Sequence, residues 1–335
     1  MNRNYLLFCG SLLLAAPATM ALADGPAFHV TSRQALAGDT KWDYLSFDSA
    51  SHRLFIAHSD HVDVFDTEQK KLVGSVDNTA GVHGVALAPE LDRGYTSNGA
   101  SSTVTIFELS TLRVLGALPT EKKPDAIVYD PFSQRVFVAN GDSGTLTVVD
   151  AKTGKLVATI AVGGQLEFQA VDGKGRLYVN VESKNLLAVV DTTQLKVLTQ
   201  YDISTACDAP TGLAIDPATQ RLFVGCRNQK MAVVAGDSGK ILASMPVGKG
   251  CDATAFDPVL RQAFASSGDG TLTVVSSETY AVSQVVATQP TGKTMALDPV
   301  THRIYVAVAD VEAPATKGVR QKLKAGTFTL LTIAK

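Results

Sequence analysis

A repeat of about 42 residues runs through most of the chain, and it constrains the fold more than any other feature of the sequence. In the clearest copy, residues 129–139 read YDPFSQRVFVA, and related segments recur along the chain. Each copy joins an anchor position to an Arg four or five residues later; the seven anchors, spaced by 40 to 44 residues, are Asp48, Ala88, Asp130, Asp172, Asp216, Asp257 and Asp298. Periods of this length are typical of solenoids and propellers.

Each copy has the pattern of four short strands. In the third copy we expect strands over 126–129, 135–140, 145–150 and 155–162, which are rich in Val, Ile, Leu and Thr and are separated by Gly, Asp, Ser and Pro. An open β-solenoid is the alternative, but solenoids usually repeat at shorter periods. The sequence therefore predicts an all-β, seven-bladed β-propeller with four antiparallel strands in each blade.

The two ends of the chain predict how the ring closes. The seventh copy runs from Thr294 to the C-terminus and contains only three clear strands, the third of them over 327–333. A strand over 28–33 would supply the missing fourth, so we expect the last blade to be closed by the N-terminal strand. The length of 335 residues would also suit two average domains, but the repeat favours a single propeller domain over 24–335.

Residues 1–23 have the pattern of a signal peptide. Arg3 precedes a nearly uncharged apolar run over 5–16, and Ala21-Leu22-Ala23 supplies a small-residue cleavage pattern. The apolar run is shorter than the ~20 residues that a transmembrane helix needs. Cys9 lies before most of the apolar run and follows the bulky Phe8, which argues against a lipoprotein. We expect a periplasmic or secreted protein, after removal of the signal peptide, with no membrane span.

The overall charge limits the kinds of partner. With 45% hydrophobic residues and a formal net charge of −2, the chain is too apolar and too neutral to be disordered. It lacks the basic excess of a dedicated nucleic-acid binder. A protein or a small molecule is therefore the expected partner, and nucleic acid is not.

The repeat also indicates where a site would lie. In a propeller, the first strand of each blade lines the central channel, and the loops before it open on one face of the ring. The positions five residues before the anchors predict a mainly acidic ring at one channel mouth, formed by Asp43, His83, Asp125, Glu167, Thr211, Asp252 and Lys293. His83, Glu167 and Lys293 depart from the repeat, whereas a repeated Asp also suits backbone hydrogen bonds between blades.

A second, more neutral ring is expected near the same mouth. It lies five residues after each repeat Arg and contains His58, Asn98, Asn140, Val181, Cys226, Ser266 and Val308. Polar members of the two rings form the candidate ligand-binding set, which is Asp43, His83, Asp125, Glu167, Asp252, Lys293, His58, Asn98 and Asn140.

The sequence assigns no cofactor and no metal ligand. Carboxylates with Asn oxygens would suit Ca²⁺. A transition ion would instead suit His58 and His83 with Asp43, extended by Asp60 and His61. Neither set has a metal-binding spacing motif, so a solvated, half-acidic mouth is the simplest interpretation.

One insertion interrupts the last copy, where residues 310–325 replace a short turn between the second and third strands. The segment carries Pro314 and the basic residues Lys317, Arg320, Lys322 and Lys324. Such a loop either folds over the acidic mouth, reaches a partner, or is simply solvated.

The repeats resemble the YVTN-type repeats of the YncE-like periplasmic propellers, within the seven-bladed lactonase-like superfamily. The residues that carry the resemblance are Asp130-Pro131, 135–141 (RVFVANG), 147–150 (TVVD) and Thr153-Gly154-Lys155. The resemblance covers about the whole chain after the signal peptide, and it implies the seven-bladed fold. It does not imply one activity, because function resides in sites that differ between members of a fold.

Three cysteines remain after the signal peptide. Their expected positions allow a disulfide between Cys207 and Cys226 within the fifth blade, or between Cys226 and Cys251 of the next blade. Relatives of this region, which has Pro210 to Ala214 after the first Cys and Phe223 to Gly225 before the second, often pair those two cysteines. The resemblance therefore implies a Cys207–Cys226 disulfide and a free Cys251.

These features favour an exported binding protein or scaffold that recognises an unknown protein or small molecule at the acidic mouth. The alternative is a divalent-metal-dependent hydrolase of lactone type, with Glu167, Asp125 and Asp252 as ligands of an ion that polarises the ester carbonyl and activates water. The acids include no recognisable catalytic pair, so we prefer binding to catalysis and assign no catalytic residue.

Overall fold

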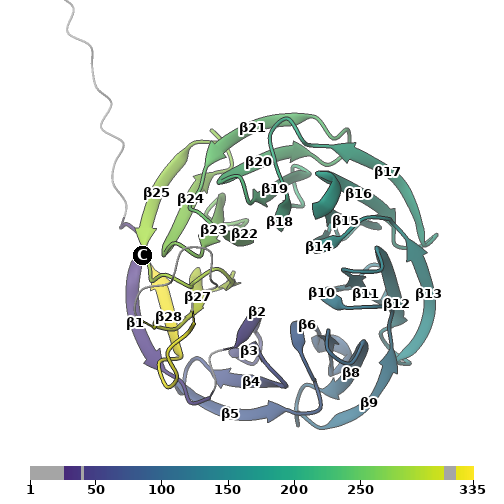
Figure 1. The fold of residues 1–335 in the computed structure, drawn as a ribbon, viewed down its shortest axis with the longest axis horizontal. Helices are drawn as coiled ribbons and strands as arrows, with labels where there is room; N and C mark the ends of the chain where they lie inside the picture. The colour runs from purple at the N-terminus through teal and green to yellow at the C-terminus, as the bar shows by residue number, and fades with distance from the viewer. Residues whose placement is uncertain (1–25, 39–40, 313–321) are drawn as a thin grey trace, which may run out of the picture.

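The computed structural model describes residues 26–38, 41–312 and 322–335, which form seven four-stranded antiparallel sheets arranged in a ring (Figure 1). The predicted seven-bladed propeller is confirmed. The predicted signal peptide over 1–23 lies outside the described residues, as do Pro314, Lys317 and Arg320 of the insertion. No helix of the described residues is long and apolar enough to cross a membrane.

The first four blades follow one another along the chain, and each begins with the strand that lines the channel. Their strands are β2 (Trp42–Asp48), β3 (Arg53–His58), β4 (His61–Asp66) and β5 (Lys71–Val76); β6 (Val82–Ala88), β7 (Arg93–Asn98), β8 (Thr103–Glu108) and β9 (Val114–Pro119); β10 (Pro124–Asp130), β11 (Arg135–Asn140), β12 (Thr145–Asp150) and β13 (Lys155–Ala161); β14 (Leu166–Val171), β15 (Arg176–Val181), β16 (Leu186–Asp191) and β17 (Lys196–Asp202).

The remaining three blades complete the ring. Their strands are β18 (Pro210–Asp216), β19 (Arg221–Cys226), β20 (Lys230–Ala235) and β21 (Ile241–Pro246); β22 (Cys251–Asp257), β23 (Gln262–Ser267), β24 (Thr271–Ser276) and β25 (Val282–Ala287); β26 (Met295–Asp298), β27 (Arg303–Val308), β28 (Thr329–Ala334) and β1 (His29–Ala35). Two 3₁₀ turns, η1 (Pro89–Leu91) and η2 (Glu182–Lys184), are the helical elements of the described chain.

The last blade is closed by the N-terminal strand, as the sequence predicts. β1 pairs antiparallel with β28 from His29↔Ala334 to Ala35↔Thr329 and forms the outer edge of that sheet. Phe28, directly before β1, lies edge-on against Phe264 of the sixth blade at 5.3 Å between ring centroids. The side chain of Gln284 also bonds the backbone N–H and C=O of Phe28. The N-terminal segment therefore ties two neighbouring blades together.

The hydrophobic core lies between blades rather than within them. Each of the seven apolar clusters combines residues of two adjacent blades, for example Phe137 and Leu146 of the third with Leu166 and Leu177 of the fourth. A blade alone therefore cannot bury its apolar faces, which makes the ring the unit of stability.

The repeated Asp and Arg residues serve the structure. The Asp130 carboxylate accepts hydrogen bonds from the backbone N–H and the hydroxyl of Ser133, which fixes the turn between β10 and β11. Arg135 donates to the carbonyl oxygen of Thr192 in the next blade at 2.6 Å, and Arg53 donates to that of Leu109 at 3.0 Å. These bonds tie the outer turns of neighbouring blades together.

The sixth blade departs from the predicted register by one residue. Asp257 pairs with Gln262 instead of Arg261, and Arg261 adopts a left-handed conformation with φ of 56°. Ser267, not Ser266, therefore ends the second strand opposite Cys251. The interval of four residues between Asp257 and Arg261 does not by itself predict this change, because Asp172 and Arg176 have the same interval and Arg176 begins β15.

Replacement of Phe28 tests the closure of the ring. Phe28 is 3% exposed, so Phe28→Ala removes a buried aromatic ring and should lower the free energy of unfolding by about 3 kcal/mol. The neighbouring exposed residue His29 provides the control, because His29→Ala should change the free energy of unfolding by less than about 0.5 kcal/mol. Denaturant unfolding measures both, and a cost below about 1 kcal/mol for Phe28→Ala would show that this segment is dispensable.

Candidate functional site

The mouth-facing end of the channel is built from β-bulges. In β2 the register with β3 shifts between Trp42 and Leu45, and β6, β10, β14, β18 and β22 shift at the equivalent place. A bulge leaves a residue out of the ladder and re-aims its side chain. The bulges contain six of the predicted ring residues, which are Asp43, His83, Asp125, Glu167, Thr211 and Asp252.

Three of these residues, from three successive blades, come together. The His83 Nδ1 atom lies 2.6 Å from Asp43 Oδ2 and 3.7 Å from Asp125 Oδ1. One donor atom from each of the three side chains lies within 4.8 Å of the other two. Residues about 40 positions apart in sequence thus form one cluster, as the repeat predicts.

The environment changes the pKa of two members of this cluster. The pKa of Asp125 is raised to about 6. Burial is the largest cause, the nearby Asp43 and Asp252 add to it, and His83 and Lys123 oppose it. Burial lowers the pKa of His83, but the hydrogen bond to Asp43 and the charges of Asp125 and Asp43 outweigh this effect and raise it. His83 is therefore held toward its cationic form by the two carboxyls.

Glu167 is the most perturbed carboxyl of the mouth. It is 8% exposed, and burial, followed by the charges of Asp125, Glu182 and Asp252, raises its pKa to about 9. Glu182 is itself paired with Arg227, at 2.5 Å between Oε1 and Nε. No cationic side chain within the described residues lies within ion-pair distance of Glu167.

Asp252 has a cation of its own. Lys293 Nζ lies 2.5 Å from Asp252 Oδ2, and the negative charges of Asp252 and Asp43 raise the pKa of Lys293 against the effect of burial. The mouth therefore combines the Asp252–Lys293 and Glu182–Arg227 pairs with the buried carboxyl of Glu167 and with Asp125, which lies 3.7 Å from His83.

Two aromatic rings close the channel below these side chains. Tyr44 of β2 and Phe168 of β14 come from blades on opposite sides of the ring, yet their centroids lie 4.9 Å apart in an edge-on contact (Figure 1). Burial and then the charges of Asp252, Asp125, Asp43 and Glu167 raise the pKa of Tyr44 well above its usual range. Tyr44 and Phe168 thus form a floor, and the mouth is a pocket.

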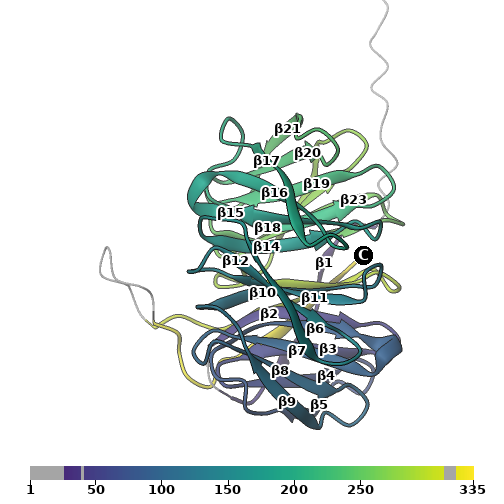
Figure 2. The same ribbon diagram turned by 90° about the vertical axis from the view of Figure 1, so that its right-hand side faces the viewer.

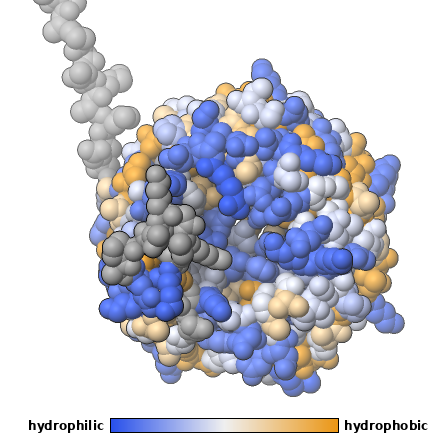
Figure 3. Space-filling view, viewed as in Figure 1, coloured by the Kyte–Doolittle hydropathy of each residue, from blue (hydrophilic) through white to orange (hydrophobic). Residues whose placement is uncertain are grey.

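A pocket of about 970 Å³ opens at the mouth, and neither Tyr44 nor Phe168 lines it. Of the predicted ring residues, Asp43, His83 and Lys293 line it, together with Glu312 and Lys322 from the two ends of the insertion, whereas Asp125, Glu167 and Asp252 do not. In the space-filling view this face is hollowed at its centre and hydrophilic side chains surround the hollow (Figure 3).

The described ends of the insertion form a short ribbon beside the pocket. Val311 pairs antiparallel with Leu323, the Glu312 N–H donates to the Lys322 carbonyl oxygen at 2.8 Å, and Lys322 Nζ lies 3.0 Å from Glu312 Oε1. The ribbon stands out from the mouth face of the propeller (Figure 2). The base of the insertion therefore forms one wall of the pocket.

The opposite half of the channel is lined mainly by apolar side chains. Its cavity of about 440 Å³ is lined by side chains that follow the floor residues along the first strands, among them Leu45, Val85, Ile127 and Phe256. The two ends of the channel thus differ in chemistry, and the titratable groups gather at the mouth.

The polar members of the second predicted ring lie inside the blades. Asn98 Nδ2 donates to Thr105 Oγ1 at 2.9 Å, and Asn140 Nδ2 donates to Thr147 Oγ1 at the same distance. His58 Nδ1 lies 2.8 Å from Asp63 Oδ2 in the corresponding position of the first blade. All three side chains are fully buried and do not line the pocket, and their ligand-binding role stays a prediction.

Sequence reasoning missed four residues of the site. Glu182 and Arg227 follow the second strands, where the other blades have small residues, namely Ser59, Gly99, Gly141, Gly268 and Ala309. Tyr44 and Phe168 follow the acidic ring, where the other blades have Gly84, Ala126, Gly212, Ala253 and Thr294. Departures from the repeat at these two positions are the signal that would have identified all four.

The predicted disulfide is confirmed. Cys207 and Cys226 are joined within the fifth blade, with 5.4 Å between their Cα atoms. The rival pairing with Cys251 is thereby excluded. Cys251 is a free, buried thiol, and burial raises its pKa to about 12.

A comparison with protein families gives one match. The sequence profile of the outer membrane protein assembly factor BamB matches residues 100–313, which is more than half of the chain. The chain belongs to this family. The region that matches the BamB profile extends from the second blade to the base of the insertion in the seventh, so it includes Asp125, Glu167 and Asp252 of the mouth. No curated protein matches the sequence.

The pKa of Glu167 predicts how stability depends on pH in this BamB-family propeller. Between pH 4.5 and about 9 the folded protein retains a proton that the unfolded chain releases, so stability falls as pH rises. Glu167→Gln removes this loss. As pH rises through that range, the free energy of unfolding of the variant should therefore increase relative to that of the wild type by up to about 1.4 kcal/mol per pH unit. Denaturant unfolding from pH 5 to 8 measures the difference.

The exposed Glu278 provides the matched control. Glu278→Gln should leave the pH dependence of unfolding as it is in the wild type. A stability difference between Glu167→Gln and wild type that stays constant with pH would contradict the assigned environment of Glu167.

Proposed function

We propose that this protein is an exported, YncE-like propeller of the YVTN-repeat type that binds the cationic group of a partner protein or small molecule in the mouth pocket. In this proposal the propeller is a rigid binding module. Asp125, which lies beside the pocket-lining His83, and the neighbouring Glu167 receive the positive charge, while Asp252 and Glu182 are already paired with Lys293 and Arg227.

One observation carries the proposal. Asp125 and Glu167 are buried carboxyls whose pKa values are both raised, and their mutual repulsion contributes to that of Glu167. Carboxyls in this state gain most from an added cation, because it removes the repulsion and restores the charged form. An ammonium or guanidinium group placed between them is the simplest such cation.

The shape of the pocket supports recognition of a side chain or a small molecule. Its volume of about 970 Å³ lies within the range of ligand sites in proteins. The floor formed by Tyr44 and Phe168 supports an occupant that enters and stops, rather than a chain that threads the channel.

Export and a scaffold role rest on separate arguments. The pattern of residues 1–23 supports export, and the Cys207–Cys226 disulfide suits an oxidising compartment such as the periplasm. The family to which the chain belongs is described as an outer membrane protein assembly factor, which agrees with a role in holding partners.

The hydrolase alternative has weaker support. It needs Glu167, Asp125 and Asp252 as metal ligands, but Asp252 is paired with the ammonium group of Lys293. The donor atoms that converge are those of Asp43, His83 and Asp125 instead. The arrangement of charges therefore favours binding.

Calorimetric titration with spermidine tests the proposal. Binding of this amine at pH 7 should release protons, because a cation lowers the raised pKa values of Glu167 and Asp125. Titration in two buffers with different enthalpies of ionisation measures the number of protons. The Glu167→Gln variant should bind more weakly by about 10-fold, the effect of one charge-assisted contact, and should release fewer protons.

The exposed variant Glu278→Gln again provides the control and should bind as the wild type does. The absence of spermidine binding at millimolar concentration would contradict the proposal. Binding with the same affinity and proton release in Glu167→Gln would contradict it as well.

A further inference from the structure

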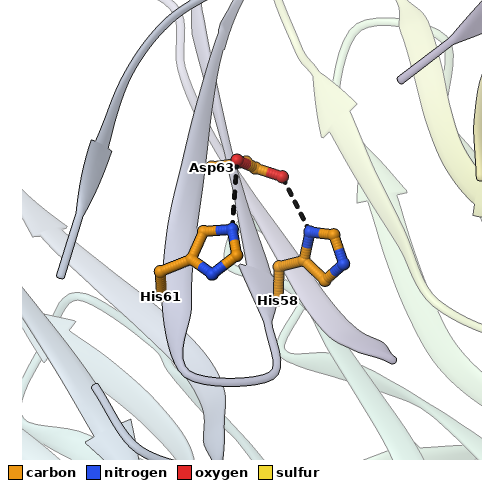
Figure 4. A group of neighbouring side chains, drawn as sticks. All are labelled: His58, His61 and Asp63. Atoms are coloured by element: carbon orange, nitrogen blue, oxygen red, sulfur yellow. Dashed lines mark hydrogen bonds and ion pairs between the residues drawn. The ribbon is translucent and has the colours of Figure 1, made fainter. Parts of the chain in front are cut away.

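A second group of ionisable side chains lies in the hairpin between β3 and β4, outside the acidic ring of the mouth. The group consists of His58, His61 and Asp63 (Figure 4). His58 Nδ1 lies 2.8 Å from Asp63 Oδ2, and His61 Nε2 lies 3.4 Å from Asp63 Oδ1. The two imidazole rings are neighbours, with 4.9 Å between their centroids. One carboxylate thus faces two histidines.

The tight turn of this hairpin creates the arrangement. Ser59 and Asp60 alone connect the strands, with Ser59 in a left-handed conformation at φ of 60°, so His58 pairs directly with His61. In the second and third blades the same turn has four residues, and the strand ends pair as Asn98↔Thr103 and Asn140↔Thr145. The shorter turn and its histidines are therefore particular to the first of these three blades.

The sister blades show what the fold itself requires at these positions. There a neutral amide meets a hydroxyl, in the Asn98–Thr105 and Asn140–Thr147 hydrogen bonds. The first blade instead buries a carboxyl and an imidazole, with Asp63 6% and His58 0% exposed. A charged group is costly to bury, and a neutral pair fills the same place in the two sister blades, so the exchange is a departure from the repeat.

We propose that His58, His61 and Asp63 bind a divalent transition-metal ion of the zinc type. Two imidazole nitrogens and one carboxylate oxygen are the donor set that such ions prefer. Ligand atoms at ~2.1 Å from a tetrahedral zinc ion are roughly 3.4 Å apart. Asp63 Oδ2 lies 2.8 Å from His58 Nδ1 and Asp63 Oδ1 lies 3.4 Å from His61 Nε2, and one ligand atom of each side chain lies within 4.8 Å of the other two. The site needs only small side-chain movements to bind the ion.

Asp60 provides an independent argument for this role. Its Oδ1 atom lies 2.9 Å from His61 Nδ1, while His61 Nε2 faces Asp63. A histidine that ligates a metal through one nitrogen usually donates its other N–H to a carboxylate, which fixes the orientation of the ring. His61 is partly exposed, with 31% of its side chain accessible, so an ion can reach the group from solvent.

The site does not depend on the function proposed for the mouth pocket. Its residues belong to one hairpin, whereas Asp43, His83 and Asp125 come from three blades. A metal bound by the hairpin would hold the turn that contains Ser59, and Ser59 lines the pocket. The mouth cluster is the rival binding site for the same ion, and the test must separate the two.

Titration of the tag-free, metal-stripped protein with Zn²⁺ tests the proposal. The wild type should bind one ion, as measured by calorimetry and by elemental analysis after dialysis, and its melting temperature should rise. His61→Ala should lose the stoichiometric ion, because it removes one ligand from a partly exposed position. Asp60→Ala should weaken binding by about 10-fold, the usual effect of removing the carboxylate that orients a ligating histidine.

His83→Ala provides the matched control, because it removes the only histidine of the mouth cluster and should leave Zn²⁺ binding unchanged. The Co²⁺-loaded wild type should show d–d absorption without a thiolate charge-transfer band, since its ligands are nitrogen and oxygen. The proposal fails if the wild type binds no Zn²⁺, if His61→Ala retains it, or if His83→Ala loses it. In the last case the ion belongs to the mouth.

Discussion

The antiparallel pairing of β1 with β28 is the interaction on which the rest of the structure depends. Every apolar cluster lies between two adjacent blades, so each blade needs neighbours on both sides. The pairing completes the seventh blade, which packs against both the sixth and the first. The closed ring also fixes the distance between opposite first strands. Tyr44 meets Phe168 across the channel only because the blades between them are held in place. The chemistry of the mouth follows from this closure.

The repeat was sufficient to predict the fold and the convergence of three side chains at the mouth. Spacing along the chain identified Asp43, His83 and Asp125 as equivalent, and equivalent residues converge in a closed ring. The direction in which each side chain points was harder to predict, because it depends on the hydrogen-bond partners in adjacent strands. Asn98 and Asn140 occupy equivalent positions too, but threonines of the adjacent strands hold their amides inside the blades.

Two kinds of feature could not be predicted from the repeat, namely side-chain contacts between blades and the lengths of turns. The pairing of Glu182 with Arg227 joins two blades through single departures from the repeat, and the Tyr44–Phe168 contact joins blades that are not neighbours. The hairpin histidines are brought together by a turn that is two residues long, a property that an averaged repeat conceals. Departures from a repeat therefore carry the information about sites, while the repeat itself carries the fold.

The near-zero net charge of the chain conceals an uneven distribution of charge. Burial raises the pKa values of Glu167 and Asp125, and the positive charge near these carboxyls does not offset it. Carboxyl ¹³C NMR of these two residues, followed from pH 3 to pH 10, tests it most directly. The account predicts a midpoint near pH 9 for Glu167 and near pH 6 for Asp125. Midpoints of both groups near their ordinary values, 4.5 and 3.8, would contradict it.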